Sequence, residues 1–547
     1  MWVVQIKKEE TKQITLNVRY KILNLSIYAN LIITQLLFYL MKLYFLFPFL
    51  SLISLSTSIV KYPSMYEVSA RPWLYSLSLK YKQPITSFKQ IPDEVFNTLK
   101  SQGFTFIWVM GVWSIGSYGV THDRTNPRLT NKFKQILPDY KDTDAIGSPY
   151  AITDYICNPE LCPGGNADLM WLKSQLNERG MYLMLDFVPN HSALDSSWVT
   201  EHIEYYIRAP KGMTELDPDV YYTNGIAYGS TKGLDDIWSD VGQLNYFNKD
   251  TRALMLEKLL VVAEFSDAIR VDTASFIVNR IFKSSWKEQL DSWGYDEPAD
   301  EFWPNAIKTV KAKYPNIKFF AEVFGELVME MLNEGFDYAY EKGLLDVLMN
   351  DGIDTVKNYI TYMRQWQEKT ARFLENHDDN RAVAFFDKNE QKSFAAALIA
   401  YTLPSMRFFF QDCFYGYKNK LDVHLLRAQD EPKSESAEVF YDKLFKLINS
   451  DTMSNGKWEP VKFNGRDGWK FLSWKWLNAE EKIIVVVNFS DAKGEGNVVI
   501  SDVKGEGEIT IKDMLSDEEF KVDAEEVKTK GFTVSVSEWY GRVLQYN

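Results

Sequence analysis

The stretch Ala371-Arg-Phe-Leu-Glu-Asn-His-Asp-Asp-Asn-Arg381 turns from an apolar run into a cluster of charged and polar side chains. Three earlier stretches have the same form, at residues 182–191, 267–272 and 319–322. Each is a short run of β-forming or apolar residues with a carboxylate at or near its end. Such runs, separated by long mixed segments, are typical of the buried parallel strands of βα units. Because a (β/α)8 barrel carries its functional groups at the C-terminal ends of its strands, we predict this TIM-barrel fold.

Four further apolar runs raise the number of candidate barrel strands to eight: residues 65–68, 104–110, 336–340 and 406–410. The fold class is therefore α/β. Helical patterns between the strands support this prediction, among them residues 91–100, with acidic residues in the first turn, and residues 167–179, which stop before Gly180. The segment that follows the second strand, from Gly111 to about Asn166, reads as irregular.

The chain divides into a leader and three further parts. We assign residues 1–62 to the leader, 63–191 and 241–452 to the barrel, and 192–240 to a short inserted subdomain after the third strand. The insert is polar and rich in Gly and Pro, and a loop of this length is usually functional. Residues 453–547 alternate apolar and polar side chains between turns, which predicts an antiparallel C-terminal domain, a β-sandwich.

Composition limits the class of partner. The chain of 547 residues has a formal net charge of −13, and the leader is basic, so the rest is still more acidic. Nucleic acid would need a basic footprint, and we therefore exclude it as a partner. Aromatic residues make up 15% of the chain, which suits a neutral ligand such as a sugar.

The leader has two interpretations. Residues 31–60 are almost continuously apolar, long enough to span a bilayer, and Lys42 is the only charge among them. From Met41 the sequence has the pattern of a secretory signal peptide: a basic residue, an apolar region and a small-residue end. Cleavage is expected between about Ser56 and Tyr62. The alternative is a type II membrane anchor with a basic tail. The protein is expected to be secreted or lumenal in the first case and membrane-bound only if the leader is retained.

The three cysteines are too few for a disulfide framework. Cys157 and Cys162 could close a small loop in an oxidising compartment, or remain free thiols. Zinc is not expected, because no second pair of Cys or His ligands stands at the required spacing.

The strand ends resemble, in the usual order, the four signature regions of the α-amylase family of glycoside hydrolases, which are retaining (β/α)8-barrel α-glycosidases. The residues that carry the resemblance are Asp186-Phe-Val-Pro-Asn-His191, Arg270-Val-Asp272, Ala-Glu322-Val and Asn376-His-Asp378. Val241-Gly-Gln-Leu-Asn245 is similar to an accessory motif of the same family. The resemblance covers roughly residues 65–547.

The resemblance implies three catalytic residues. Asp272 corresponds to the nucleophile, Glu322 to the general acid/base and Asp378 to the carboxylate that holds sugar hydroxyls and steadies the transition state. Retaining hydrolysis needs two such carboxyl groups about 5–5.5 Å apart. Arg270 stands two residues before Asp272 on one strand, so both side chains are expected on one face, where the guanidinium keeps Asp272 ionised.

Further residues form the predicted substrate-binding set: Arg270, His191, His377, Asp186, Tyr150 and Arg381. Asp186 is either a loop cap or a direct contact. Asn190 resembles the calcium ligand of calcium-binding members, but the insert offers no convincing acidic partner, so no cofactor is required and calcium is only possible. His202 and His424 fall outside the motifs and are expected on the surface or in the core.

One departure from the family pattern bears on the substrate. Many starch-cleaving members have Lys-His three and four residues after the nucleophile, where this chain has Ser275 and Phe276. The expected function is retaining hydrolysis of α-glucosidic bonds in α-glucans or maltooligosaccharides. Two alternatives remain: a transglycosylase with the same residues, and a catalytically silent, membrane-anchored scaffold with an amylase-like barrel.

Overall fold

The computed structural model describes residues 59–229 and 237–546. The predicted leader therefore lies, up to Ser58, outside the described residues. Within them, no helix is both long enough and apolar enough to cross a bilayer.

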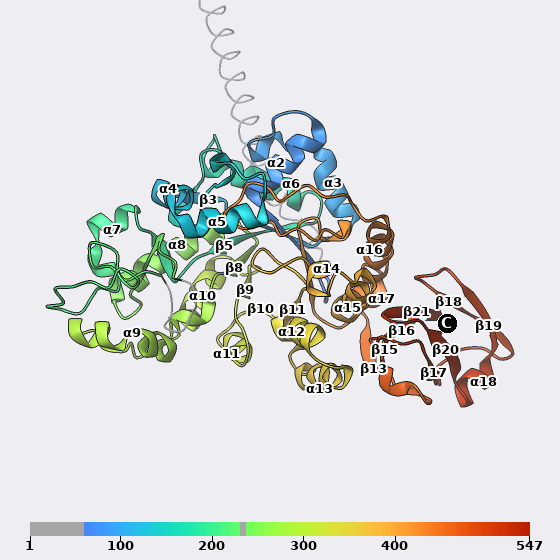
Figure 1. Cartoon of the computed structure of the whole chain (residues 1–547). Helices are drawn as coiled ribbons and strands as arrows, with labels where there is room; N and C mark the ends of the chain where they lie inside the picture. Colours follow the sequence, from blue (N-terminus) through green and yellow to red (C-terminus); the bar gives the residue numbers. More distant parts are fainter. Residues whose placement is uncertain (1–58, 230–236, 547) are drawn as a thin grey trace, which may run out of the picture. The chain divides into compact units, whose positions relative to one another are not determined.

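Eight parallel strands close into a barrel in the order β1-β12-β11-β10-β9-β8-β5-β2. The labelled barrel strands β5, β8, β9, β10 and β11 lie among the surrounding helices in Figure 1. All eight predicted strands are confirmed, and nearly all of their residues are buried. The barrel strands are β1 (Ser64–Ser69), β2 (Phe106–Met110), β5 (Tyr182–Phe187), β8 (Ala268–Val271), β9 (Lys318–Ala321), β10 (Tyr338–Tyr340), β11 (Thr370–Arg372) and β12 (Met406–Phe410).

Helices connect the barrel strands, as a parallel sheet requires. Both sequence-predicted helices are present, as α3 and α6. The helices of the barrel are α2 (Ala70–Tyr81), α3 (Asp93–Ser101), α6 (Asn166–Asn177), α8 (Lys249–Phe265), α9 (Asn279–Trp293), α10 (Phe302–Lys313), α11 (Leu327–Asn333), α12 (Lys342–Asn350), α13 (Ile353–Met363), α14 (Ala382–Phe385), α15 (Glu390–Thr402), α16 (Glu435–Ile448) and α17 (Asp451–Asn455).

The segment between β2 and α6 is more regular than its sequence indicated. It contains the antiparallel pair β3 (Trp113–Ile115) and β4 (Ile152–Cys157), and two helices, α4 (Ser117–Thr125) and α5 (Pro127–Ile136). Asn126 ends α4 and caps α5, where its side chain accepts from the backbone N–H of Arg128. The insert after β5 contains α7 (Ser197–Glu201) and is closed by the pair β6 (His191–Ala193) and β7 (Val241–Gln243).

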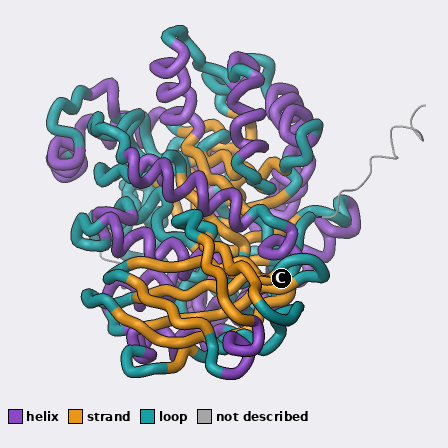
Figure 2. The backbone as a smooth tube through the Cα atoms, turned by 90° about the vertical axis from the view of Figure 1, so that its right-hand side faces the viewer, coloured by secondary structure: helices purple, strands orange, loops and turns teal. Residues whose placement is uncertain are grey.

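The C-terminal domain is antiparallel, as predicted. A six-stranded sheet has the order β13-β15-β16-β21-β18-β19 and a three-stranded sheet the order β14-β17-β20, and side chains of both share one apolar core. The strands of this domain are the orange segments near the C-terminus in Figure 2. Its elements are β13 (Lys457–Pro460), β14 (Phe463–Asn464), β15 (Phe471–Leu477), β16 (Lys482–Asn488), β17 (Gly494–Val498), β18 (Glu508–Asp513), β19 (Glu519–Asp523), α18 (Ala524–Thr529), β20 (Phe532–Val536) and β21 (Tyr540–Tyr546).

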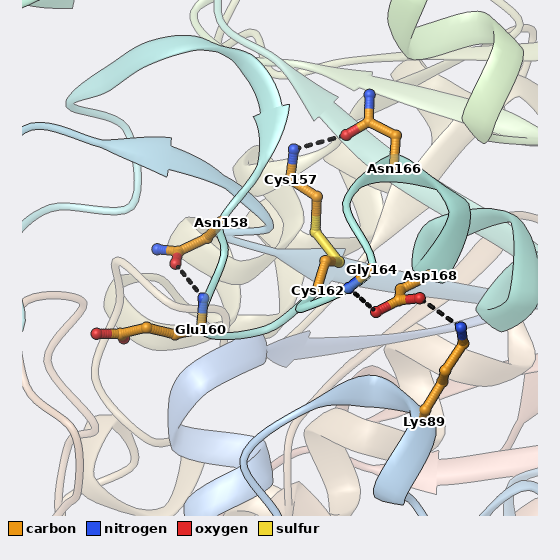
Figure 3. Close-up of a disulfide and its surroundings, with 8 residues drawn as sticks. All are labelled: Lys89, Cys157, Asn158, Glu160, Cys162, Gly164, Asn166 and Asp168. Atoms are coloured by element: carbon orange, nitrogen blue, oxygen red, sulfur yellow. Dashed lines mark hydrogen bonds and ion pairs between the residues drawn. A yellow bond between two sulfur atoms is a disulfide. The ribbon is translucent and has the colours of Figure 1, made fainter.

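Cys157 and Cys162 form a disulfide between β4 and α6 (Figure 3). The backbone N–H of Cys157 donates to Asn166, the first residue of α6, at 2.8 Å. Cys413 is buried and free. The short bridge thus fixes the turn that leads into α6.

Candidate active site

Arg270 is the centre of the site. Its guanidinium is fully buried and contacts three carboxyl groups: Asp272 at 2.9 Å, Glu322 at 2.9 Å and Asp186 at 3.2 Å. These residues come from the C-terminal ends of the neighbouring strands β5, β8 and β9. The expected pairing of Arg270 with Asp272 on one face of a strand is present. A single cation therefore holds the three carboxyl groups together.

Asp186 lies beneath the other carboxyl groups. One of its oxygens accepts from the Trp108 indole at 2.9 Å and the other from Arg270. Burial raises the pKa of Asp186 to about 6, although Arg270 and Trp108 favour its charged form. Asp186 does not line the cleft, so the structure places it as a support for Arg270.

Thr273 joins the two central carboxyl groups and was not singled out from the sequence. Its N–H donates to Glu322 Oε2 at 2.7 Å and its hydroxyl to Asp272 Oδ2 at 3.2 Å. The backbone of Thr273 is left-handed, with φ of 41°, a conformation that is costly for a β-branched residue. Backbone strain of this kind is concentrated at functional sites, where the surroundings impose it.

Glu322 is held in a state suited to proton donation. Burial raises the pKa of Glu322 to about 8, and the charges of Asp272 and Asp378 act in the same direction, whereas Arg270 opposes them. At neutral pH this carboxyl group therefore keeps its proton. A carboxylic acid with a raised pKa beside an ionised carboxylate is the arrangement that acid-assisted bond cleavage requires.

His377 is the link in a second buried chain. Its Nδ1 contacts Glu67 on β1 at 2.5 Å, and its Nε2 lies 3.0 Å from both Asp378 and the Tyr150 hydroxyl. Burial opposes a charge on His377, but Asp378 and Glu67 outweigh it and raise the pKa of the imidazole well above its usual range. The His377 imidazole beside Asp378 holds the pKa of that carboxyl group well below its usual range. Glu67 was missed by the sequence analysis.

His191 and Asn190 lie at the start of the insert. Burial lowers the pKa of His191, so its imidazole is neutral at neutral pH. The side-chain oxygen of Asn190, the residue that resembles a calcium ligand, accepts a hydrogen bond from Gln243 Nε2 at 3.0 Å. Calcium takes six to eight oxygen ligands. Across residues 59–229 and 237–546, no group of three His, Cys, Asp or Glu side chains is arranged to hold a metal ion.

The central residues open into a cleft of about 650 Å³. Six sequence-predicted site residues line it, and so does Thr273: the six are Tyr150, His191, Asp272, Glu322, His377 and Asp378. Arg381 is not among the lining residues, because its guanidinium binds Glu375 at 2.8 Å and the Gln411 carbonyl at 2.7 Å. His424, expected on the surface or in the core, lines the cleft instead. His202 is exposed, as expected.

A closed parallel barrel with this carboxyl cluster at its strand ends defines a glycoside hydrolase of the barrel class. Residues 99–446 match the family described as alpha amylase, catalytic domain, over more than half of the chain. The chain belongs to the α-amylase family.

Individual relatives are distant. Alpha-amylase 3 of Dictyoglomus thermophilum is 22% identical over 401 residues, which are 62% of this chain and 74% of that protein. An alpha-glucosidase of Culex pipiens is 23% identical over 259 residues, 44% of this chain and 40% of that protein. Among solved structures, a maltogenic alpha-amylase from Thermotoga neapolitana has a TM-score of 0.63 at 20% identity, with 89% of this chain and 99% of that one covered. This likeness shows that the two structures share the fold.

Proposed function

We propose that the protein is a retaining α-glycosidase that hydrolyses α-glucosidic bonds in α-glucans or maltooligosaccharides. In the first step the Asp272 carboxylate attacks the anomeric carbon, and Glu322 gives its proton to the departing oxygen. The C1–oxygen bond breaks and a glycosyl ester forms on Asp272. In the second step Glu322, now ionised, takes a proton from water, which attacks the same carbon and frees Asp272.

The observation that carries this proposal is the Arg270 bridge. Two nitrogens of one guanidinium each contact one carboxyl group, Asp272 and Glu322, both at 2.9 Å. An inverting enzyme keeps its two carboxyl groups about 6.5–9.5 Å apart to admit water between them, and a retaining enzyme about 5–5.5 Å. A shared cation favours the shorter separation.

The substrate class is supported by the relatives. The curated proteins that match are an alpha-amylase and an alpha-glucosidase, and one solved neighbour, an alpha-amylase of Geobacillus thermoleovorans, was crystallised with acarbose. In this chain Asp378 is half exposed in the cleft, where it is free to accept hydrogen bonds from sugar hydroxyls.

We also propose that the enzyme works outside the cytosol. The leader and the Cys157–Cys162 bridge support this, because disulfides persist in oxidising compartments. A mature protein that starts between about Ser56 and Tyr62 would support the signal peptide. Retention of residues 1–40 would favour the anchor.

The test is product analysis with maltoheptaose. The body from about Ile59 and its Asp272→Asn variant are incubated with the sugar, and the products are separated by chromatography. Shorter oligosaccharides from the parent alone are expected. Longer products would favour transfer to sugar over transfer to water. No product from either protein would contradict the proposed hydrolysis and favour the scaffold.

A further inference from the structure

Three connected segments line one part of the cleft, and we call them the closed rim: residues 117–136, 237–241 and 420–427. Lys132 of α5 contacts Asp422 at 3.0 Å, and Asp123 of α4 accepts from His424 Nδ1 at 2.8 Å. The segment 237–241 joins through Ser239 Oγ, 3.0 Å from His122 Nε2. The rim is therefore one connected wall.

Burial strengthens these ties. Asp123 and Asp422 are 0% and 1% exposed, so solvent screens their ion pairs little. Burial opposes the charge of His424, yet hydrogen bonding and attraction to Asp123 raise its pKa to about 9. The His424–Asp123 pair is therefore charged at neutral pH.

Backbone bonds anchor the rim below its side-chain ties. Ile146 N–H donates to the His424 carbonyl at 2.9 Å, and Leu426 N–H donates to the Asp144 carbonyl at 2.8 Å. Arg427 adds contacts to Asp144 at 2.9 Å and Asp139 at 3.1 Å. The loop that follows β12 is thus joined to the segment that follows β2.

The strand order places this wall relative to the chemistry. In the closed barrel β1 lies between β12 and β2, and β9 is four strands away in either direction. The rim rises from the loops after β12, β2 and β5, which are three, three and two strands away from β9, the strand that ends at Glu322. Because Glu322 protonates the departing oxygen, the leaving group exits on the β9 side. The sugar attacked by Asp272 then points its non-reducing end toward the rim.

Asp240 offers this end of the sugar an acceptor. Its side chain lines the cleft and is 8% exposed, and Oδ2 has no hydrogen-bond partner among the described residues. A buried carboxylate oxygen without a donor is costly, and a sugar hydroxyl would satisfy it.

From this arrangement we infer that the enzyme is exo-acting: the closed rim stops the substrate, so that glucans enter with the non-reducing end first and are cut near that end. This inference rests on the proposed function and names the substrate end that the same site accepts. The reducing-end remainder leaves over the β9 side, where Phe324 is 47% exposed two residues after Glu322.

The test compares two p-nitrophenyl α-maltoheptaosides, one free and one with a 4,6-O-ethylidene group on its non-reducing terminal glucose. We expect the enzyme to consume the free compound at least about 100-fold faster, with short products from the non-reducing end. Equal rates on both compounds would overturn the inference and leave the proposed function intact. Turnover of neither would contradict the proposed function itself, and with it the inference.

A rim variant makes the test sharper. Lys132→Ala removes the tie to Asp422 from a side chain that is half exposed, so the fold should survive. We expect the blocked-to-free rate ratio to rise by about fivefold or more as the wall loosens. Lys308→Ala, an exposed lysine on α10 outside the rim, is the matched control and should match the parent. An unchanged ratio in Lys132→Ala would contradict the rim's role.

Discussion

The floor of the cleft and its closed rim are built on different principles. The floor consists of side chains at the ends of β5, β8 and β9, fixed by strand register and gathered around buried Arg270. The rim consists of helices and loops inserted between barrel elements and joined by ion pairs such as Lys132–Asp422. The barrel therefore fixes the chemistry, and the insertions decide which end of a substrate reaches it.

The largest effect should come from the floor. Asp272→Asn removes the attacking carboxylate, and kcat should fall by about four orders of magnitude. Asp354→Asn, with an 86% exposed side chain, is the control and should leave kcat unchanged. Steady-state kinetics on maltooligosaccharides check this. A variant with more than a tenth of the parent kcat would show that another group forms the intermediate.

Glu322→Gln should lower kcat by about 10²–10⁴ when the leaving group needs a proton. Because the pKa of Glu322 is raised to about 8, the parent should lose kcat as pH rises through that value and the proton is lost. The pH profile of the variant should lack this alkaline limb, and Glu326→Gln, an exposed neighbour in the same loop, should keep it. If the Glu322→Gln variant lost kcat over the same alkaline range, that loss would belong to the titration of another group.

Glu67→Gln tests a buried residue of β1 that acts on the site through His377. Without the negative charge of Glu67, the pKa of His377 should drop, so that the imidazole loses its proton at a lower pH than in the parent. We expect kcat/KM to be about tenfold below the parent at pH 8 and closer to it at pH 5.5. Glu204→Gln breaks the exposed His202 pair, at 3.1 Å, and should leave the profile unchanged. A uniform loss at all pH values would instead indicate a packing role.

The smallest effect on rate should come from the disulfide. Replacement of Cys157 and Cys162 by Ser should lower the free energy of unfolding by about 2 kcal/mol, since the loop they close is short. Both cysteines lie outside the cleft lining, so kcat should stay within a factor of about two. Denaturant unfolding and kinetics measure the two effects. A large loss of kcat in a folded variant would mean that the turn into α6 supports the site.

The sequence was enough to predict the catalytic residues at the floor of the cleft, but it did not predict the closed rim. Apolar runs that end in carboxylates identify strand ends, and Asp272, Glu322 and Asp378 converge as predicted. Glu67 was missed although a lone acidic residue inside the buried run 65–68 is a signal of function. The left-handed backbone of Thr273 has no such signal, because tertiary packing imposes it.

The sequence analysis missed the closed rim because apolar residues do not recur at a regular spacing in its segments. α4 has only Gly119 and Asp123 buried, and a buried Asp there depends on His424 from a distant loop. α5 did offer a signal, since Asn126 followed by Pro127 marks a helix start. The sequence analysis placed Arg381 in the substrate-binding set because it stands next to a motif. That position does not reveal that Glu375 and the Gln411 carbonyl bind its guanidinium.

The most direct test of the central claim is proton NMR of the first product released from maltoheptaose. If Asp272 forms a glycosyl intermediate that water opens from the same face, the new anomeric signal should be α at the earliest times, with β appearing only by mutarotation. The Asp272→Asn variant should give no signal on this timescale. A β signal that precedes α in the parent would mean inversion, and would contradict the role assigned to Asp272 and its bridge to Glu322.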